Sequence, residues 1–356
     1  METYRILVIN PGSTSTKIAV FENEKEVWRE SVDHTAEELA QYPVIADQLE
    51  MRKACVVNAL EDHGEDMKDF AAVAARGGCI VPVEMGAYEV NDLVCDIAMH
   101  RPGDQHPSNL ASVIGKQLAD SVGIKAYFYD STMVDEFDEI HKMSGVKGIR
   151  RPSSGHQLNA RAAALKYCSD NGLEYREQDI IVTHLGGGIT TMMHQHGRVV
   201  EMFMDWTGSF SPERSGVLPT RGAVLYAMNS GLTAEEVLKK FQRSGGMISY
   251  CGTSDMRKVE KMIADGDAYA KTAYEAMALQ VSKDICAMAA NVCGDVDGII
   301  LTGGLANSKM LTGMIVKRVE FVHEVTIMPG EQEMSALACG VLRVLRGEEE
   351  AKILTE

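Results

Sequence analysis

Runs of apolar residues separated by short polar turns predict two sets of three strands along this chain. In each set the first two strands are largely apolar, and a third strand follows after a turn. The sets are separated by about half the chain, which suggests two related halves. The predicted strands are Arg5–Ile9, Thr16–Phe21 and Glu26–Ser31 in the first half, and Asp179–His184, Ile189–His194 and Arg198–Met202 in the second.

Beyond each set, amphipathic segments alternate with single apolar runs. This order predicts an α/β protein in which helices cover mixed sheets. The single strands are predicted at Ala71–Ala75, Ile124–Tyr129, Asp297–Leu301 and Phe321–Met328. Helices are predicted at 44–61, after Asn91, at 107–121, at 156–171, through 220–292 with the longest at 267–292, at 307–316 and at 331–345. The acidic segment Glu348–Glu350 is predicted to be frayed.

The bulk composition narrows the class of protein. With 356 residues, 45% of them hydrophobic and 24% charged, the chain can form two globular domains. The net charge of −16, without a basic cluster, argues against a nucleic-acid partner. The 8 cysteines form no C-x-x-C pair, the N-terminal segment lacks a secretory pattern, and no apolar stretch approaches the roughly 18 residues that span a bilayer. We therefore expect a cytoplasmic protein with reduced thiols and no membrane association.

The turn between the first two strands carries a run of small polar residues. Asn10, Ser13 and Ser15 offer an amide, hydroxyl groups and backbone N–H groups at one point, and Lys17 adds an ammonium group. The terminal phosphates of a nucleotide need such a set of donors. A hairpin alone needs only two or three turn residues, so we interpret the run as a phosphate site rather than as an ordinary turn.

Two glycine-rich turns in the second half are further candidates for ligand contact. Gly186, Gly187 and Gly188 stand between two strands, and the context favours a second phosphate loop over a simple bend or bulge. Gly303 and Gly304 follow an apolar strand, where glycine permits either a flat ligand or a neighbouring helix to approach closely.

Several charged residues follow predicted strands or turns. Asp130 ends an apolar strand, a position that suits a metal ligand or catalytic carboxylate as well as an N-cap. Arg76 lies in R-G-G and Arg214 in P-E-R-S-G, so each is either an anion-binding residue or a surface arginine. His156 stands near a predicted helix start, where capping is the alternative role. Glu333 opens the last predicted helix, where a carboxylate also complements the helix dipole.

Other histidines are weaker candidates. His106 precedes a predicted helix, where a satisfied capping residue is the more common outcome. His194 and His196 alternate on a predicted strand and could form a metal pair, but the sequence offers no further ligands beside them.

Seven motifs occur in order along the chain. They are N-P-G-S-T-S-T-K at Asn10, H-P-S-N at His106, Y-D-S-T at Tyr129, H-L-G-G-G at His184, S-P-E-R-S-G-V-L-P-T at Ser211, L-T-G-G-L-A at Leu301 and P-G-E-Q-E-M at Pro329. Together they resemble the motifs of the acetate kinase family, and of the butyrate kinases within it. The resemblance spans essentially the whole chain, and S-P-E-R-S-G and P-G-E-x-E-M are closer to butyrate kinases than to acetate kinases.

The resemblance implies a fold and an activity. The fold would be the duplicated ribonuclease H-like fold of actin, Hsp70 and sugar kinases, with ATP between two domains, residues 1–154 with 334–356 and residues 155–333. The activity would be reversible, Mg²⁺-dependent transfer of a phosphoryl group from ATP to a short-chain fatty acid, with butyrate expected, giving ADP and an acyl phosphate. A homo-oligomer, a dimer or larger, is expected of the family.

The resemblance also implies roles for individual residues. Asn10, Ser13, Ser15 and Lys17 would meet the terminal phosphates and the metal ion, and His184 with Gly186, Gly187 and Gly188 would form the second phosphate loop. Gly303, Gly304 and Asn307 would face the adenosine. The catalytic positions would be Asp130, His156, Arg76, Arg214 and Glu333, and the metal ligands Asn10, Asp130 and Glu333.

The sequence departs from the family at several positions. Gly155 stands where relatives tend to have an aromatic residue, and Glu201–Trp206 lacks the D-V-N-N run of butyrate kinases. Val73 occupies the place of a further arginine, and Gly187 that of an asparagine. These departures leave open an acetate, propionate or isobutyrate kinase. A filament or chaperone ATPase of the same fold and a sugar or glycerol kinase are the alternatives from other classes.

Overall fold

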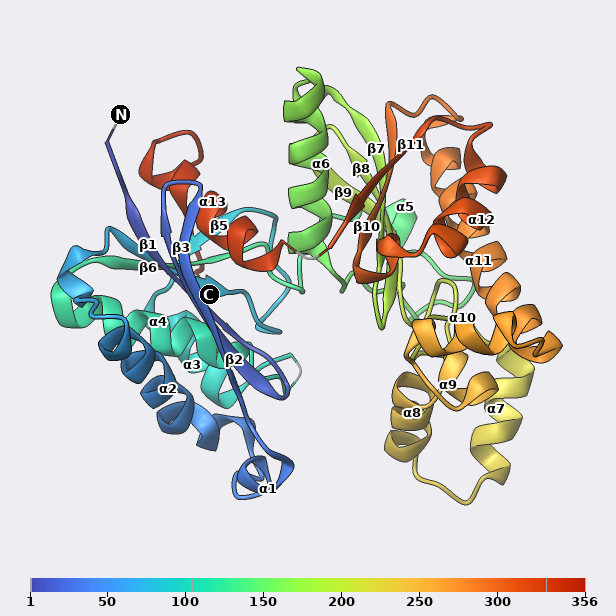
Figure 1. Cartoon of the computed structure of the whole chain (residues 1–356), viewed down its shortest axis with the longest axis horizontal. Helices are drawn as coiled ribbons and strands as arrows, with labels where there is room; N and C mark the ends of the chain where they lie inside the picture. Colours follow the sequence, from blue (N-terminus) through green and yellow to red (C-terminus); the bar gives the residue numbers. More distant parts are fainter. Residues whose placement is uncertain (1, 104, 331, 356) are drawn as a thin grey trace. The chain divides into compact units, whose positions relative to one another are not determined.

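The structure, a computed structural model, describes residues 2–103, 105–330 and 332–355. It forms two compact units (Figure 1). The first unit comprises Met1–Asp135 and Gln332–Glu356, and the second Glu136–Glu331. The predicted boundaries, after residues 154 and 333, lie further along the chain than these.

The first unit is built on a mixed seven-stranded sheet with the order β12-β5-β6-β4-β1-β2-β3. The pairs β1–β2 and β2–β3 are antiparallel, and β4 and β6 extend the sheet in parallel with β1. Buried apolar side chains such as Leu7 and Val73 explain why these segments form a sheet interior. The strands are β1 (Arg5–Pro11), β2 (Ser15–Glu22), β3 (Lys25–Asp33), β4 (Ala72–Arg76), β5 (Ala87–Glu89), β6 (Lys125–Tyr129) and β12 (Lys352–Ile353).

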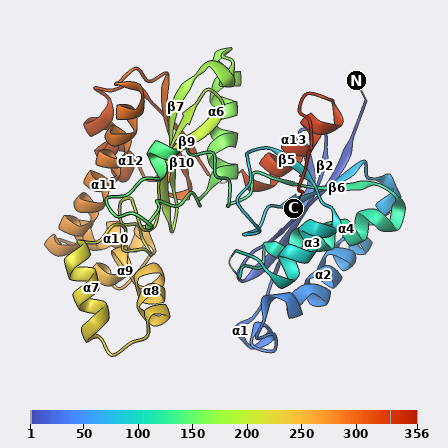
Figure 2. The ribbon, with the colours of Figure 1, turned by 180° about the vertical axis from the view of Figure 1, so that it is seen from behind.

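Helices cover both faces of this sheet. α13 lies on one face, and α2, α3 and α4 lie on the other (Figures 1 and 2). Gly340 allows α13 to approach β6, because a Cβ atom there would lie 2.6 Å from the ring of Tyr129. The helices are α1 (Ala36–Leu39), α2 (Leu49–Asp62), α3 (Asp92–His100), α4 (Asn109–Val122) and α13 (Glu333–Leu345), with short 3₁₀ turns at Ile45–Gln48 and Met67–Asp69.

The second unit repeats the arrangement on a five-stranded sheet with the order β11-β10-β7-β8-β9. It corresponds strand by strand to β6-β4-β1-β2-β3 of the first unit, with the same antiparallel hairpins and parallel additions. The predicted duplication is therefore confirmed. The strands are β7 (Asp179–Leu185), β8 (Ile189–Gln195), β9 (Arg198–Phe203), β10 (Gly298–Gly303) and β11 (Val325–Pro329).

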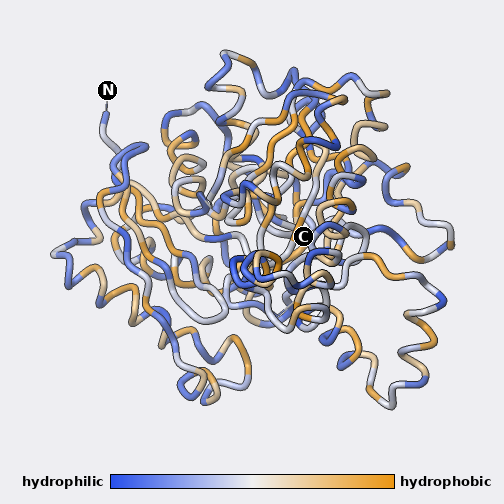
Figure 3. The backbone as a smooth tube through the Cα atoms, turned by 45° about the vertical axis from the view of Figure 1, so that its right-hand side comes forward, coloured by the Kyte–Doolittle hydropathy of each residue, from blue (hydrophilic) through white to orange (hydrophobic). Residues whose placement is uncertain are grey.

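The core of the second unit lies where α11 packs against the sheet. Met277, Val281 and Ile285 of this helix are fully buried together with Ile299 and Leu301 of β10. Figure 3 shows that hydrophobic and hydrophilic stretches alternate along the backbone. The helices are α5 (Glu139–Lys142), α6 (Gln157–Asn171), α7 (Thr220–Asn229), α8 (Ala234–Arg243), α9 (Gly246–Cys251), α10 (Met256–Ala264), α11 (Ala268–Ala289) and α12 (Lys309–Val319), with 3₁₀ turns at Tyr175–Glu177, Ala290–Val292 and Gly304–Asn307. Within the described ranges no helix combines the length and the hydropathy needed to cross a membrane.

One predicted strand starts later in the sequence than expected. The strand predicted from Phe321 begins only at Val325, because the preceding residues form a turn in which the Phe321 side chain is exposed. The predicted start of the last helix at Glu331 lies outside the described residues, and α13 begins at Glu333.

The acidic segment predicted to be frayed is instead attached to the first sheet. Tyr129 donates a hydrogen bond of 2.7 Å to Glu349 Oε2, and the backbone N–H of Ala87 donates one of 3.2 Å to Glu349 Oε1. Arg343 forms an ion pair with the same carboxylate. After it, β12 pairs with β5. The acidic composition suggested a solvated segment, but the Glu349 carboxylate is bound by the partly buried guanidinium of Arg343 and the hydroxyl of Tyr129.

Candidate active site

The β1–β2 turn presents polar groups as the sequence predicts. The backbone N–H of Gly12 donates to the Ser15 carbonyl at 2.7 Å, which closes the turn and leaves the Ser13 side chain exposed at its tip. Asn10 and Lys17 pair in register, so their side chains lie on the same face of the sheet. Within the described ranges Lys17 has no ion-pair partner, which leaves its charge available to an anion.

Three predicted residues from distant parts of the chain meet beside this turn. Asn10 Nδ2 donates a hydrogen bond of 2.9 Å to Glu333 Oε2 at the start of α13. Arg76 Nη2 lies 3.5 Å from the other carboxylate oxygen of Glu333. The parallel pairing of β1 with β4 explains the arrangement, because it places the ends of the two strands side by side.

Asp130 joins this cluster at the end of β6. It is buried and has a positive φ of 40°, a conformation that Asp tolerates better than most residues. Its Oδ1 accepts a hydrogen bond of 2.8 Å from the Gly86 N–H. Arg76 Nη1 donates to the Asp130 carbonyl at 3.5 Å. Arg76 therefore contacts both acidic residues that sequence reasoning singled out.

The donors of this cluster fit a magnesium ion that is shared with a bound phosphate. Within the described ranges no group of three or more His, Cys, Asp and Glu residues surrounds one point. Mg²⁺ commonly binds through one or two carboxylates together with water and substrate phosphates, rather than in an all-protein cage. Asp130, Glu333 and the Asn10 amide provide such oxygen donors.

The glycine loop of the second unit is held by the segment that bears Arg214. The Gly186 N–H donates to the Gly188 carbonyl at 3.0 Å, and the Ser211 hydroxyl donates to the Gly187 carbonyl at 2.6 Å. A Cβ atom on Gly188 would overlap Arg214 Nη1. Glycine is therefore required here so that the guanidinium can reach the loop.

Asp205 fixes the position of Arg214 and was not among the predicted site residues. Its Oδ2 lies 2.7 Å from Arg214 Nε. Burial raises the pKa of Asp205, while the charge of Arg214 acts in the opposite direction. The signal in the sequence was a single acidic residue between Met204 and Trp206, inside a segment of mainly apolar residues.

His156 and His184 lie together beside the same loop. Their rings stack with centroids 4.3 Å apart and planes inclined by 17°. His156 Nδ1 lies 2.8 Å from Thr190 Oγ1, and a Cβ atom on Gly186 would lie 3.0 Å from His184 Nε2. The structure thus brings four predicted features of the second unit together, namely the two histidines, the glycine loop and Arg214.

Two of the departures from the family are neighbours in space. A Cβ atom on Gly155 would lie 2.7 Å from Met202 Sδ and 3.0 Å from Thr190 Cγ2. Met202 is buried. The space that a side chain at position 155 would need is therefore occupied by Met202.

Gly303 is explained by packing. Its φ is 91°, and a Cβ atom there would overlap the Leu185 carbonyl. It also exchanges two backbone hydrogen bonds with Gly330. Gly304 has open space at its Cβ position, and Asn307 Nδ2 donates to the Gly304 carbonyl at 3.0 Å. The predicted adenosine contact at these residues stays a prediction.

His106 and His194, the weaker histidine candidates, have structural roles. His106 Nδ1 lies 2.7 Å from Ser108 Oγ and accepts from the Ser108 N–H, so it stabilises the turn before α4. His194 Nδ1 contacts the Tyr175 hydroxyl at 2.8 Å, and burial lowers the pKa of His194 to about 3. His196 is exposed at the end of the hairpin, and within the described ranges no metal cluster includes either residue.

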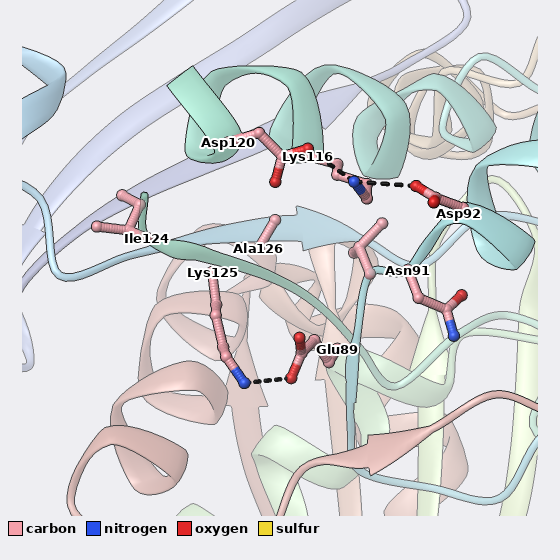
Figure 4. Close-up of a pocket in the computed structure, with 9 residues that line it drawn as sticks. Glu89, Asn91, Asp92, Lys116, Asp120, Ile124, Lys125 and Ala126 are labelled. Carbon is pink, nitrogen blue, oxygen red and sulfur yellow. Dashed lines mark hydrogen bonds and ion pairs between the residues drawn. The ribbon is translucent and has the colours of Figure 1, made fainter. Parts of the chain in front are cut away.

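A pocket of about 220 Å³ lies apart from these residues in the first unit (Figure 4). Lys116 on its wall is paired with Asp92 at 3.0 Å and with Asp120 at 2.7 Å. Lys125 is paired with Glu89 at 2.6 Å. Each cation of the pocket is thus already neutralised by a neighbouring carboxylate, which makes the pocket a poor site for an anionic substrate.

The buried Asp284 gives the Arg214 segment a pH-dependent stability. Its Oδ2 accepts a hydrogen bond of 2.6 Å from the Ser209 N–H, and burial raises its pKa from 3.8 to about 6. Because the folded protein holds this proton more tightly, the contribution to the free energy of unfolding falls as pH rises from about 4 to 6. We expect Asp284→Asn to stabilise the protein by about 1–3 kcal/mol at pH 7.5 and not at pH 4. Thermal unfolding at both pH values measures the difference; an equal effect at both would contradict the assignment.

Comparison with known proteins places the chain in one family. The model of the acetokinase family matches residues 156–335. Butyrate kinase 2 of Clostridium acetobutylicum is 42% identical over 351 residues, which cover 98% of this chain and 99% of that protein. The crystal structure of acetate kinase from Porphyromonas gingivalis superposes with a TM-score of 0.79 at 18% identity, over 96% of this chain and 100% of that one.

The fold extends beyond carboxylate kinases. A ROK family protein from Streptococcus pneumoniae, solved in complex with sucrose, superposes with a TM-score of 0.53 at 15% identity, over 97% of this chain and 100% of that one. The predicted fold class, the duplicated fold of actin, Hsp70 and sugar kinases, is thereby confirmed. With a full-length relative at 42% identity and the family model over its second half, this chain belongs to the acetokinase family.

Proposed function

We propose that this protein is a Mg²⁺-dependent kinase that phosphorylates a short-chain fatty acid with ATP, and that its preferred acid is butyrate. The observation that carries the kinase assignment is the contact between Arg214 and Gly188, because it puts a fixed cation directly on a phosphate-type loop. The preference for butyrate rests on the full-length relative, which is named Butyrate kinase 2.

The reaction depends more on neutralising the negative charges of the two substrates than on acid or base catalysis. A carboxylic acid is ionised at neutral pH, so no residue has to remove a proton from the nucleophile. One carboxylate oxygen forms a bond to the γ-phosphorus as the bond to the β-phosphate oxygen breaks, and ADP leaves with that electron pair. Both reactants are anions, and cations must therefore hold them together.

Each basic residue of the candidate site has a task in this proposal. Arg214 and Arg76 would hold the acid and the equatorial oxygens of the transferring group, and His156 would donate a hydrogen bond to it. Lys17 would stabilise the oxygens of the leaving ADP, with Ser13 and Ser15 beside it. Asn10, Asp130 and Glu333 would hold Mg²⁺, which when bound neutralises phosphate charge.

The substrate preference is tested by an acid panel. Acyl phosphate is trapped as the hydroxamate, and kcat/KM is measured for acetate, propionate, butyrate, isobutyrate and valerate. We expect a maximum at butyrate, with each missing methylene reducing kcat/KM by about 10-fold or more, because a methylene in an apolar pocket is worth about 1–3 kcal/mol. A maximum at acetate would defeat the butyrate assignment while leaving the carboxylate kinase intact.

The same assay separates the other classes of activity. ATP hydrolysis that does not depend on any acid would indicate an ATPase of this fold. Phosphorylation of a sugar or glycerol would require a base for a neutral hydroxyl group, and Asp130 would then take that role. Either result, without hydroxamate formation, would overturn the proposed function.

A further inference from the structure

A buried arginine lies directly under the β1–β2 turn and takes no part in the reaction proposed above. Arg52 of α2 is 0% exposed. Its Nη1 donates hydrogen bonds of 3.0 Å to the Ser15 carbonyl and of 3.0 Å to Thr16 Oγ1. Its Nε donates to Gln48 Oε1 at 2.9 Å. The guanidinium is thus attached to the strand that leaves the turn.

In the part of the chain that the structure describes, this charge has no carboxylate partner. Within the described ranges no acidic oxygen lies within ion-pair distance of Arg52, and its Nη2 is buried without a hydrogen-bond acceptor. Glu38, a nearby acid that acts on its charge, is directed to His34 Nδ1 at 3.4 Å. Burial lowers the pKa of Arg52, yet an arginine remains protonated at neutral pH. An unpaired buried charge is costly, and most proteins avoid it.

Arg52 also helps to fix the shape of the turn. The Ser15 carbonyl that it binds is the same atom that accepts the closing hydrogen bond from Gly12. His34 completes the support, because its N–H donates to the Thr14 carbonyl at 2.8 Å and its Nε2 lies 2.9 Å from Thr16 Oγ1. Adjacent strand residues point to opposite faces, so Arg52 acts from the face opposite to Lys17.

We propose that Arg52 is a positioning residue for the nucleotide, and that its buried charge is compensated by the phosphates bound at the β1–β2 turn. The inference rests on the proposed function and names a determinant of its nucleotide site. Without nucleotide the turn carries an excess of positive charge, from Arg52 below it and Lys17 beside it. A multiply charged anion bound at the turn compensates this excess. Relief of the unfavourable electrostatic energy of the unpaired Arg52 charge therefore contributes to the affinity for the nucleotide.

Binding of Mg²⁺-ADP to the full-length protein tests the inference. Isothermal titration compares the wild type with Arg52→Met, which removes the charge, and with Arg52→Lys, which keeps it. Lys53→Met is the matched control, because it removes one positive charge from the next position of the same helix, at a residue that makes no hydrogen bond to the turn within the described ranges. We expect a Kd for ADP about 10-fold or more higher in Arg52→Met, an intermediate value in Arg52→Lys and the wild-type value in Lys53→Met.

Two further readouts distinguish positioning from a merely structural role. Steady-state kinetics should show a raised KM for ATP in Arg52→Met, with the KM for the acid within about twofold of the wild type. Without nucleotide, the Tm of Arg52→Met should equal or exceed that of the wild type, because an uncompensated charge has been removed. The rise in Tm on adding ADP should be smaller in the variant.

Wild-type ADP affinity in Arg52→Met, or an equal loss in Arg52→Met and Arg52→Lys, would overturn the role of the charge. If Arg52→Met does not fold, Arg52→Gln and Arg52→Lys allow the same comparison between a neutral and a charged side chain at position 52. Failure of the wild type to bind ADP would instead overturn the proposed function, and this inference with it.

Discussion

Replacing Arg214 with alanine is expected to lower kcat by about 10²-fold or more while the protein remains folded. The guanidinium lies against Gly188 and is held in place by Asp205, so it is fixed before any substrate binds. A fixed cation stabilises charge that develops on the transferring phosphoryl group without reorganising first. Steady-state assays at saturating ATP and acid measure the effect, and circular dichroism reports on the fold.

Two companion variants make this test specific. Arg221→Ala removes an exposed arginine of the same unit and should leave kcat unchanged. Asp205→Asn keeps the bulk of the partner but removes its charge, so it should lower kcat by a smaller factor than Arg214→Ala, because the guanidinium is present but less well oriented. A near-normal kcat in Arg214→Ala would remove this residue from the mechanism.

Replacing Asp130 with asparagine should reduce kcat by about 10²-fold and raise the Mg²⁺ concentration required for half-maximal activity by about 10- to 100-fold. Asparagine tolerates the positive φ of 40° and its amide oxygen can accept the Gly86 hydrogen bond. The substitution therefore changes the charge and little else. Titration of activity with Mg²⁺ at fixed ATP measures both quantities.

The control for this prediction is Asp62→Asn, which neutralises an exposed carboxylate at the end of α2. It should behave as the wild type. If Asp130→Asn kept its Mg²⁺ dependence but lost stability, the carboxylate would be a support for the loop at Gly86 and not a metal ligand.

Sequence patterns predicted the two sheets well because each hairpin consists of two largely apolar strands joined by a turn of residues that favour turns. Asn10, Arg76 and Asp130 were identifiable because each lies at or just beyond the carboxyl end of a buried strand, and parallel strands end at a common edge. The same logic found the second glycine loop. In the first unit Arg76 contacts both Asp130 and Glu333. In the second unit the glycine loop lies against Arg214 and His184.

The elements and residues that were missed have weak local signals. β5 has three residues and β12 has two, too few for a periodicity to be visible. Arg52 occupies an ordinary position in a helix with a mixed pattern, and only the tertiary structure shows that it faces the sheet. Asp205 gains its role from Arg214, which lies on a separate loop. Long-range pairing, rather than local propensity, decides all four cases.

The discontinuous first unit has a consequence for how this protein is made. Its last helix and its edge strand come from residues 332–355, which the ribosome adds only after all of the second unit. Until that segment emerges, one face of the first sheet has no cover and β5 has no outer neighbour. The second unit, continuous in sequence, can mature earlier on the nascent chain. The first unit is therefore completed last, and a stalled translation product would carry a complete glycine loop in the second unit together with an unfinished first unit.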